Sequence, residues 1–130
     1  MFLLLSKGHP RLVNALSKLY SKLTGREINA QEEFLVTAGA YEAIYCAITA
    51  LINPGDEVII IEPFFDCYEP MTRLAGGISV FIPLRPKLSK GVLSSKDWIL
   101  DPDELASKFS NKTKMIIVNT PHNPLGKVFK

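Results

Sequence analysis

The chain has 130 residues, of which 47% are hydrophobic and 22% charged, and its formal net charge is +2. These values are typical of one globular domain with a hydrophobic core, and they exclude a disordered chain. Because acidic and basic residues are interspersed, the charge gives no reason to expect nucleic acid or a membrane as a partner. No apolar run approaches transmembrane length, and Met1 to Leu5 is too short for a signal sequence. The two cysteines, Cys46 and Cys67, are expected to be buried free thiols, which fits a reducing compartment.

The first half of the chain predicts two helices separated by a short strand. Apolar residues recur at helical spacing from Pro10 to Leu23, with proline near the start and Gly25 just past the end. Phe34 to Thr37 is expected to form the strand. A turn of small residues follows, and a second helix is predicted from Ala40 to Leu51.

The second half predicts three strands that alternate with helices. The predicted strands are Glu57–Ile61, Ile78–Pro83 and Lys114–Val118, and the predicted helices are Cys67–Ala75, capped by Asp66, and Pro102–Phe109, preceded by Asp101. A long polar loop through Asp97 separates the second of these strands from the last helix. The last strand is expected to be buried on both faces, because its residues Met115 to Val118 are all apolar. The alternation indicates an α/β fold with a mainly parallel sheet.

Three loops would leave the carboxyl ends of parallel strands, which is where open α/β sheets bind ligands. The turn Gly39-Ala40-Tyr41 opens a helix, so its backbone N–H groups and the helix dipole could bind an anion. An ordinary strand-to-helix turn is the alternative. The second loop carries Phe64 and Phe65, of which one ring could stack on a planar ligand, while packing of both in the core is the alternative.

The third loop is the most distinctive stretch, Asn119-Thr120-Pro121-His122-Asn123-Pro124-Leu125-Gly126-Lys127. Its prolines restrict the backbone, and the amide of Asn123 can both donate and accept hydrogen bonds. A plain tight connection is the alternative, because Asn and Pro are common in turns. His9 and His122 are expected to be structural, and no residues show metal-ligand spacing or a nucleophile–base pattern.

This last loop resembles the Asn-Pro-x-Gly loop of fold-type-I pyridoxal phosphate enzymes of the class I/II aminotransferases. The longer match is similar to the kynurenine aminotransferase/cysteine-S-conjugate β-lyase branch. Other stretches agree with that branch in register, namely Lys7–Pro10, Val36–Tyr41 and Gly55–Pro70. The resemblance covers nearly the whole chain and implies a three-layer αβα fold. Residues 1–130 would be part of the large, cofactor-binding domain.

The resemblance also implies a binding site for pyridoxal 5'-phosphate. Gly39 and the backbone groups of Ala40 and Tyr41 would hold the phosphate, and Phe65 would stack on the pyridine ring. Asn123 would hydrogen-bond the phenolic oxygen of the cofactor and the carboxylate of the substrate. The ring of Tyr41 would lie near the substrate.

The chain departs from the family by truncation, since it stops before the Schiff-base lysine, the aspartate of the pyridine nitrogen and the arginine of the α-carboxylate. It is therefore expected to hold no catalytic residue and to be inactive alone. The parent would be a homodimeric transaminase for kynurenine or glutamine and a 2-oxo acid, with β-elimination on cysteine conjugates as a side reaction. It would be cytoplasmic, with the mitochondrion as the alternative.

Two other functions stay open at this point. One is a catalytically dead isoform or fragment that at most binds a partner subunit. The other is a small Rossmann-like nucleotide binder, which is disfavoured because Gly39 stands alone where that fold needs G-x-G-x-x-G.

Two further expectations concern the backbone. The family pattern suggests cis peptide bonds at Glu62–Pro63 and Asn123–Pro124. In the family sheet, the strand near Phe34–Thr37 would lack its neighbours, so unpaired backbone groups would make the isolated chain marginally stable or unfolded.

Overall fold

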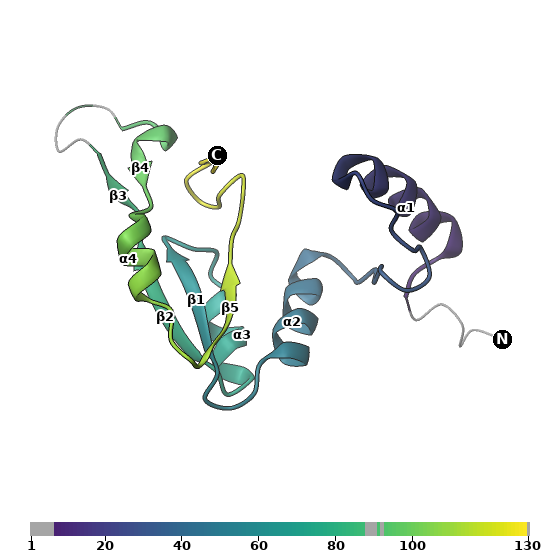
Figure 1. Cartoon of the computed structure of the whole chain (residues 1–130), viewed down its shortest axis with the longest axis horizontal. Helices are drawn as coiled ribbons and strands as arrows, with labels where there is room; N and C mark the ends of the chain where they lie inside the picture. Colours follow the sequence, from purple (N-terminus) through teal and green to yellow (C-terminus); the bar gives the residue numbers. More distant parts are fainter. Residues whose placement is uncertain (1–6, 88–90, 92, 130) are drawn as a thin grey trace. The chain divides into compact units, whose positions relative to one another are not determined.

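The computed structural model describes residues 7–87, 91 and 93–129 (Figure 1). Met1 to Leu5, which the sequence analysis considered as a signal sequence, lies outside the described residues. The chain divides into two units, Met1–Cys46 and Ala47–Lys130, and the boundary falls inside helix α2 (Ala40–Leu51). Among the described residues, no helix is long and apolar enough to cross a membrane.

The first unit is built on helix α1 (Pro10–Thr24), as predicted. His9 is the N-cap, and its Nδ1 accepts a hydrogen bond of 3.3 Å from the backbone N–H of Arg11. Gly25 ends the helix at φ +70°, a left-handed conformation that suits glycine. The structural role expected for His9 is confirmed.

The predicted strand Phe34–Thr37 is wrong, because these residues form no regular secondary structure. The backbone N–H of Val36 donates to the carbonyl of Lys7 at 3.0 Å, and the Phe34 ring lies 6.1 Å from that of Tyr20. A strand needs a hydrogen-bonded neighbour along its length. No strand pairs with this segment in the part of the chain that the structure describes.

The second unit contains a parallel sheet of β1 (Glu57–Glu62), β2 (Ile78–Pro83) and β5 (Thr113–Ile117), in the order β2-β1-β5 (Figure 1). The parallel register sets Ile59 opposite both Val80 and Ile116. These pairings confirm the α/β fold with a mainly parallel sheet.

The central strand of this sheet is β1 rather than β5. Residues Val58 to Ile61 of β1 are at most 3% exposed, whereas β5 is half-buried or exposed and Val118, just past its end, is 56% exposed. The expectation that the last strand is buried on both faces is therefore wrong. The reason is that β5 has a strand on one side only among the described residues.

Helices α3 (Tyr68–Leu74) and α4 (Pro102–Ser107) belong to the two faces of the sheet. On one face, a buried cluster is covered by Leu105 of α4 and other partly buried side chains. The cluster consists of Ile59, Ile61, Ile82 and Leu84. On the other face, Phe81 stacks on Phe64, which in turn stacks on Tyr68 of α3. Each fully buried aliphatic side chain contributes about 1.5–3 kcal/mol, so this core holds the three layers together.

The polar loop predicted through Asp97 contains regular structure. Strands β3 (Arg85–Pro86) and β4 (Trp98–Ile99) pair antiparallel, and the 3₁₀ turn η1 (Ser95–Asp97) precedes β4. The hairpin was missed because two-residue strands are too short to show a periodic pattern.

The two helix boundaries need small corrections. The N-cap of α3 is Cys67, which makes no side-chain capping bond, so Asp66 is not the cap. Helix α4 ends at Ser107 rather than Phe109, while its N-cap is Asp101 as expected, with a carboxylate that accepts from two backbone N–H groups.

Candidate functional site

The loop after β5 is held by hydrogen bonds from its own residues. The backbone N–H of His122 donates to the carbonyl of Lys127 at 2.7 Å, and the N–H of Gly126 donates to the carbonyl of His122 at 2.6 Å. The N–H of Asn123 donates to Oδ1 of Asn119 at 2.7 Å. These bonds close the loop around His122 and give the residue after it a defined backbone position.

Asn123 presents its side chain on the outside of this loop. The residue is exposed, and its side-chain amide has no hydrogen-bond partner among the described residues. Both donors and the acceptor of the amide are therefore available to a ligand. The cis bonds expected at Glu62–Pro63 and Asn123–Pro124 are confirmed, and Thr120–Pro121 is also cis.

His122 is buried beside Asn123, with an exposed fraction of 4%. Its ring meets the Phe129 ring edge-on at 5.9 Å, and Nδ1 has no partner. Burial lowers the pKa of His122 below its usual 6.5, and the nearby backbone of Ile61 offsets part of this shift. The structural role expected for His122 is confirmed as packing within the loop.

The aromatic loop after β1 separates its two phenylalanines. The ring of Phe64 lies 5.5 Å from that of Phe81 at an interplanar angle of 10°, within the layer between sheet and α3. Phe65 is half-buried, and its ring meets that of Tyr68 at 6.0 Å and 74°. Phe64 is half-buried as well, so the two rings differ in the side chains they contact, and the stacking of Phe65 on a planar ligand stays a prediction.

Phe65 and Asn123 are brought to the same edge of the sheet. The strands β1 and β5 are parallel neighbours, so the loops that follow them leave at the same end. Cys67 is buried near Phe65, and burial followed by the charge of Asp66 raises the pKa of its thiol. A thiol of raised pKa is mostly unreactive, so the expected structural role of Cys67 is confirmed, whereas Cys46 is half-buried.

The turn before α2 belongs to the first unit. Gly39 has φ +104°, and a Cβ atom at this position would meet nothing within 4 Å. The hydroxyl of Thr37 donates to the Gly39 carbonyl at 2.8 Å, and the N–H of Ala38 donates to Glu42 at 2.5 Å. Among the described residues, the N–H groups of Gly39 and Ala40 have no acceptor, as expected at a helix N-terminus.

The residues fit the parts of pyridoxal phosphate that they would meet. Free N–H groups of Gly39 and Ala40 suit a phosphate, the ring of Phe65 suits a planar pyridine, and the unpaired amide of Asn123 suits a phenolic oxygen. Tyr41 is 56% exposed, at the same helix start. The meeting of the Gly39 turn with Phe65 and Asn123 in one site stays a prediction, because the turn lies in the other unit.

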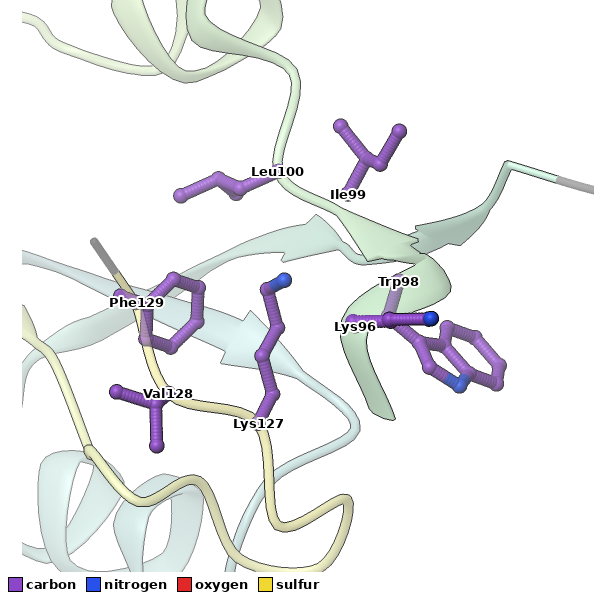
Figure 2. Close-up of a pocket in the computed structure, with 7 residues that line it drawn as sticks. All are labelled: Lys96, Trp98, Ile99, Leu100, Lys127, Val128 and Phe129. Atoms are coloured by element: carbon purple, nitrogen blue, oxygen red, sulfur yellow. The ribbon is translucent and has the colours of Figure 1, made fainter. Parts of the chain in front are cut away.

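Two hollows in the described residues contain none of these predicted site residues. One, of about 520 Å³, is shown in Figure 2 and is lined by Lys96, Trp98, Ile99, Leu100, Lys127, Val128 and Phe129. The other, of about 530 Å³, is lined by Ser17, Glu27, Ile28, Asn29, Ala30 and Glu33. No group of three or more His, Cys, Asp or Glu residues that could hold a metal ion occurs in the described part.

Comparisons with known proteins agree with this picture. Residues 3–130 match the family model of aminotransferase class I and II. Over 123 residues the chain is 60% identical to Kynurenine--oxoglutarate transaminase 3 of Mus musculus and 62% identical to that of Homo sapiens, covering 94% of this chain and 27% of each relative.

Solved aminotransferase structures share the fold. YbdL from Escherichia coli, a protein with a methionine aminotransferase function, superposes with a TM-score of 0.85 at 37% identity, over 97% of this chain and 31% of YbdL. A mutant aspartate aminotransferase of Thermus thermophilus gives a TM-score of 0.83 at 31% identity, over 95% of this chain and 30% of that one. The chain thus spans less than a third of the length of these relatives. The match to the family model and to the kynurenine transaminases confirms the resemblance, and the chain belongs to the class I and II aminotransferases.

Proposed function

We propose that this chain forms the cofactor-binding part of an aminotransferase that uses pyridoxal 5'-phosphate. The observation that carries the proposal is the free amide of Asn123 on a hydrogen-bonded loop, at the same sheet edge as the loop of Phe65. A polar group that can donate and accept, beside an aromatic ring, suits a flat ligand with a phenolic oxygen.

Pyridoxal phosphate, when bound, acts as an electron sink for bond breaking next to the amino group of a substrate. The residues of this chain bind and orient it. Asn123 would donate to the phenolic oxygen and reach the substrate carboxylate, and Phe65 would cover one face of the ring. The N–H groups of Gly39 and Ala40 would receive the phosphate. Tyr41, at the start of α2, would lie beside the substrate.

The substrates of this proposal are kynurenine or glutamine as amino donor and a 2-oxo acid as acceptor. The relatives named as kynurenine--oxoglutarate transaminases support this choice. We propose a homodimer and, as a side reaction, β-elimination on cysteine conjugates. The proposed location is the cytoplasm, with the mitochondrion as the alternative.

A hybrid protein tests this proposal. The chain replaces the matching 123 residues of the mouse transaminase to which it is 60% identical, and cofactor content and kynurenine transamination are measured. The hybrid is expected to bind pyridoxal phosphate and to transaminate kynurenine. The variant Asn123→Ala is expected to lose roughly tenfold to hundredfold in kcat/KM, because misplacement of the reacting groups is costly.

The matched control is Asn111→Ala, since Asn111 is an exposed asparagine just before β5, at the opposite end of that strand from the Asn123 loop. It is expected to leave cofactor content and kcat/KM unchanged. A hybrid that folds without taking up the cofactor, or an Asn123→Ala variant as active as the control, would contradict the proposal.

A further inference from the structure

We propose that Asn119 is a positioning residue of this site: its side chain holds the backbone of Asn123 and thereby places the free amide that would meet the cofactor. The inference rests on the proposed function, because it concerns how Asn123 is presented to pyridoxal phosphate. Asn119 is assigned no contact with the cofactor itself, and its effect on the reaction passes through Asn123.

The first step is the bond between the two asparagines. Oδ1 of Asn119 accepts the backbone N–H of Asn123 at 2.7 Å, which is the short end of the range for such a bond. Asn119 is half-buried and lies two residues past the end of β5. Its side chain therefore ties the middle of the loop to the place where the chain leaves the sheet.

The second step is the restriction of Asn123 on both sides. Its N–H is bound to Asn119, and Pro124, which follows it, disfavours helical conformations of its backbone. The side-chain amide of Asn123 has no hydrogen-bond partner among the described residues, so rotation about its own side-chain bonds is the freedom that remains. The position of that amide thus depends on the bond from Asn119.

The third step is the need for a side-chain acceptor in this loop. Pro121 has no N–H, so it cannot donate a bond that would hold the first part of the loop. The main-chain hydrogen bonds of the loop close the part from His122 to Lys127. The bond from Asn123 to Asn119 fixes the loop against the side that enters from β5.

The bond controls the position of Asn123 more than the stability of the fold. Asn123 is exposed, so its N–H can bind water once the acceptor of Asn119 is removed. A displaced amide, in contrast, can no longer meet both the phenolic oxygen and the substrate carboxylate. The loss of Oδ1 is therefore expected to change the activity and the spectrum of the bound cofactor, and to change unfolding little.

The test compares side chains of the same branched shape at position 119 in the hybrid protein. Asn119→Leu removes the acceptor and is expected to lower kcat/KM for kynurenine roughly tenfold, and to shift the visible absorption of the bound cofactor in the same direction as Asn123→Ala does. Asn119→Asp keeps an oxygen at the place of Oδ1 and is expected to stay within about threefold of the unchanged hybrid. Asn119→Ala, which lacks the acceptor and adds no apolar group, is expected to match Asn119→Leu and replaces it if the leucine variant does not fold.

The matched control is Asn29→Leu in the first unit. Oδ1 of Asn29 accepts the backbone N–H of Gln31 at 2.9 Å, so this variant loses a bond of the same kind in the other unit of the chain. It is expected to leave both kcat/KM and the cofactor spectrum unchanged.

A double-mutant cycle separates positioning from a general loss of structure. If Asn119 acts through Asn123, adding Asn119→Leu to Asn123→Ala costs little more than Asn123→Ala alone. Equal activity of the leucine and aspartate variants, or losses that multiply in the double variant, would overturn the inference. Failure of the proposed function looks different, because Asn123→Ala itself would then have no effect.

Discussion

The core of the sheet offers the most direct test of the packing described above. Ile59 lies in the central strand, is fully buried, and pairs with Val80 on one side and Ile116 on the other. Changing Ile59→Ala removes three carbon atoms from a place that the neighbouring strands cannot easily fill. The lost transfer free energy is about 2.4 kcal/mol, at about 0.8 kcal/mol for each buried carbon.

The cavity left behind adds to this loss. If nothing relaxes, removal of roughly 80 Å³ at about 24 cal/mol per Å³ adds about 1.9 kcal/mol. The free energy of unfolding of the hybrid protein should therefore fall by about 2.4 to 4.3 kcal/mol, depending on how far the cluster collapses. Urea denaturation followed by far-UV circular dichroism measures this difference.

The control for this variant is Leu74→Ala. Leu74 lies at the end of α3 and is 76% exposed, so the same measurement should change by less than about 0.5 kcal/mol. If Ile59→Ala costs no more than this control, the assignment of β1 as the buried central strand is refuted.

Three other predictions concern the stability of the folded protein. Gly77→Ala should destabilise the hybrid by about 1–3 kcal/mol, because the new Cβ would lie 2.7 Å from Cγ2 of Ile52. In urea denaturation this cost should be smaller when Ile52→Ala is already present, and full additivity of the two changes would contradict the clash. Burial lowers the pKa of His122 below 6.5, so that as the pH falls the unfolded chain takes up a proton on this histidine before the folded chain does. The stability that His122 contributes is therefore present above pH 6.5 and is lost as the pH falls below 6.5 towards the pKa of the folded state. Between about pH 6.5 and pH 5.5 this loss is at most about 1.4 kcal/mol, and it should vanish in His122→Gln, which urea denaturation at both pH values checks. The isolated chain is expected to be marginally stable or unfolded, and a cooperative far-UV circular dichroism melt above body temperature would show the opposite.

Local signals predicted most helices and strands well. The helix α1 has Pro10 in its first turn and Gly25 at its end, and both act through their own backbone geometry. The boundaries of α2 and β2 also agree with the sequence, because breakers and glycines flank them. Such features lie within a few residues of the element they define, which is why a sequence shows them.

The errors concern pairing between distant segments. Among the described residues, Phe34–Thr37 has the composition of a strand but no strand beside it, and β5 has an apolar sequence but a strand on one side only. Neither fact can be read from the segment itself, because it depends on what lies next to it in space. The same reason hid the short pairing of Arg85 and Pro86 with Trp98 and Ile99.

The candidate site was predicted from the sequence motifs of its loops rather than from the periodicity of apolar residues. The resemblance assigned Gly39, Phe65 and Asn123, and the structure adds that Phe65 and Asn123 share a sheet edge. The edge-on contact between His122 and Phe129 could not be predicted, because the way side chains pack within a loop depends on how the whole loop folds.

The open side of β5 has a consequence for handling the protein. Its free backbone N–H and C=O groups form a ready template for another extended peptide, and Val118 adds an apolar side chain at the same margin. Preparations of the chain on its own should therefore aggregate more as its concentration rises, and Val118→Lys should delay this aggregation because it places a charge beside the open edge of the sheet.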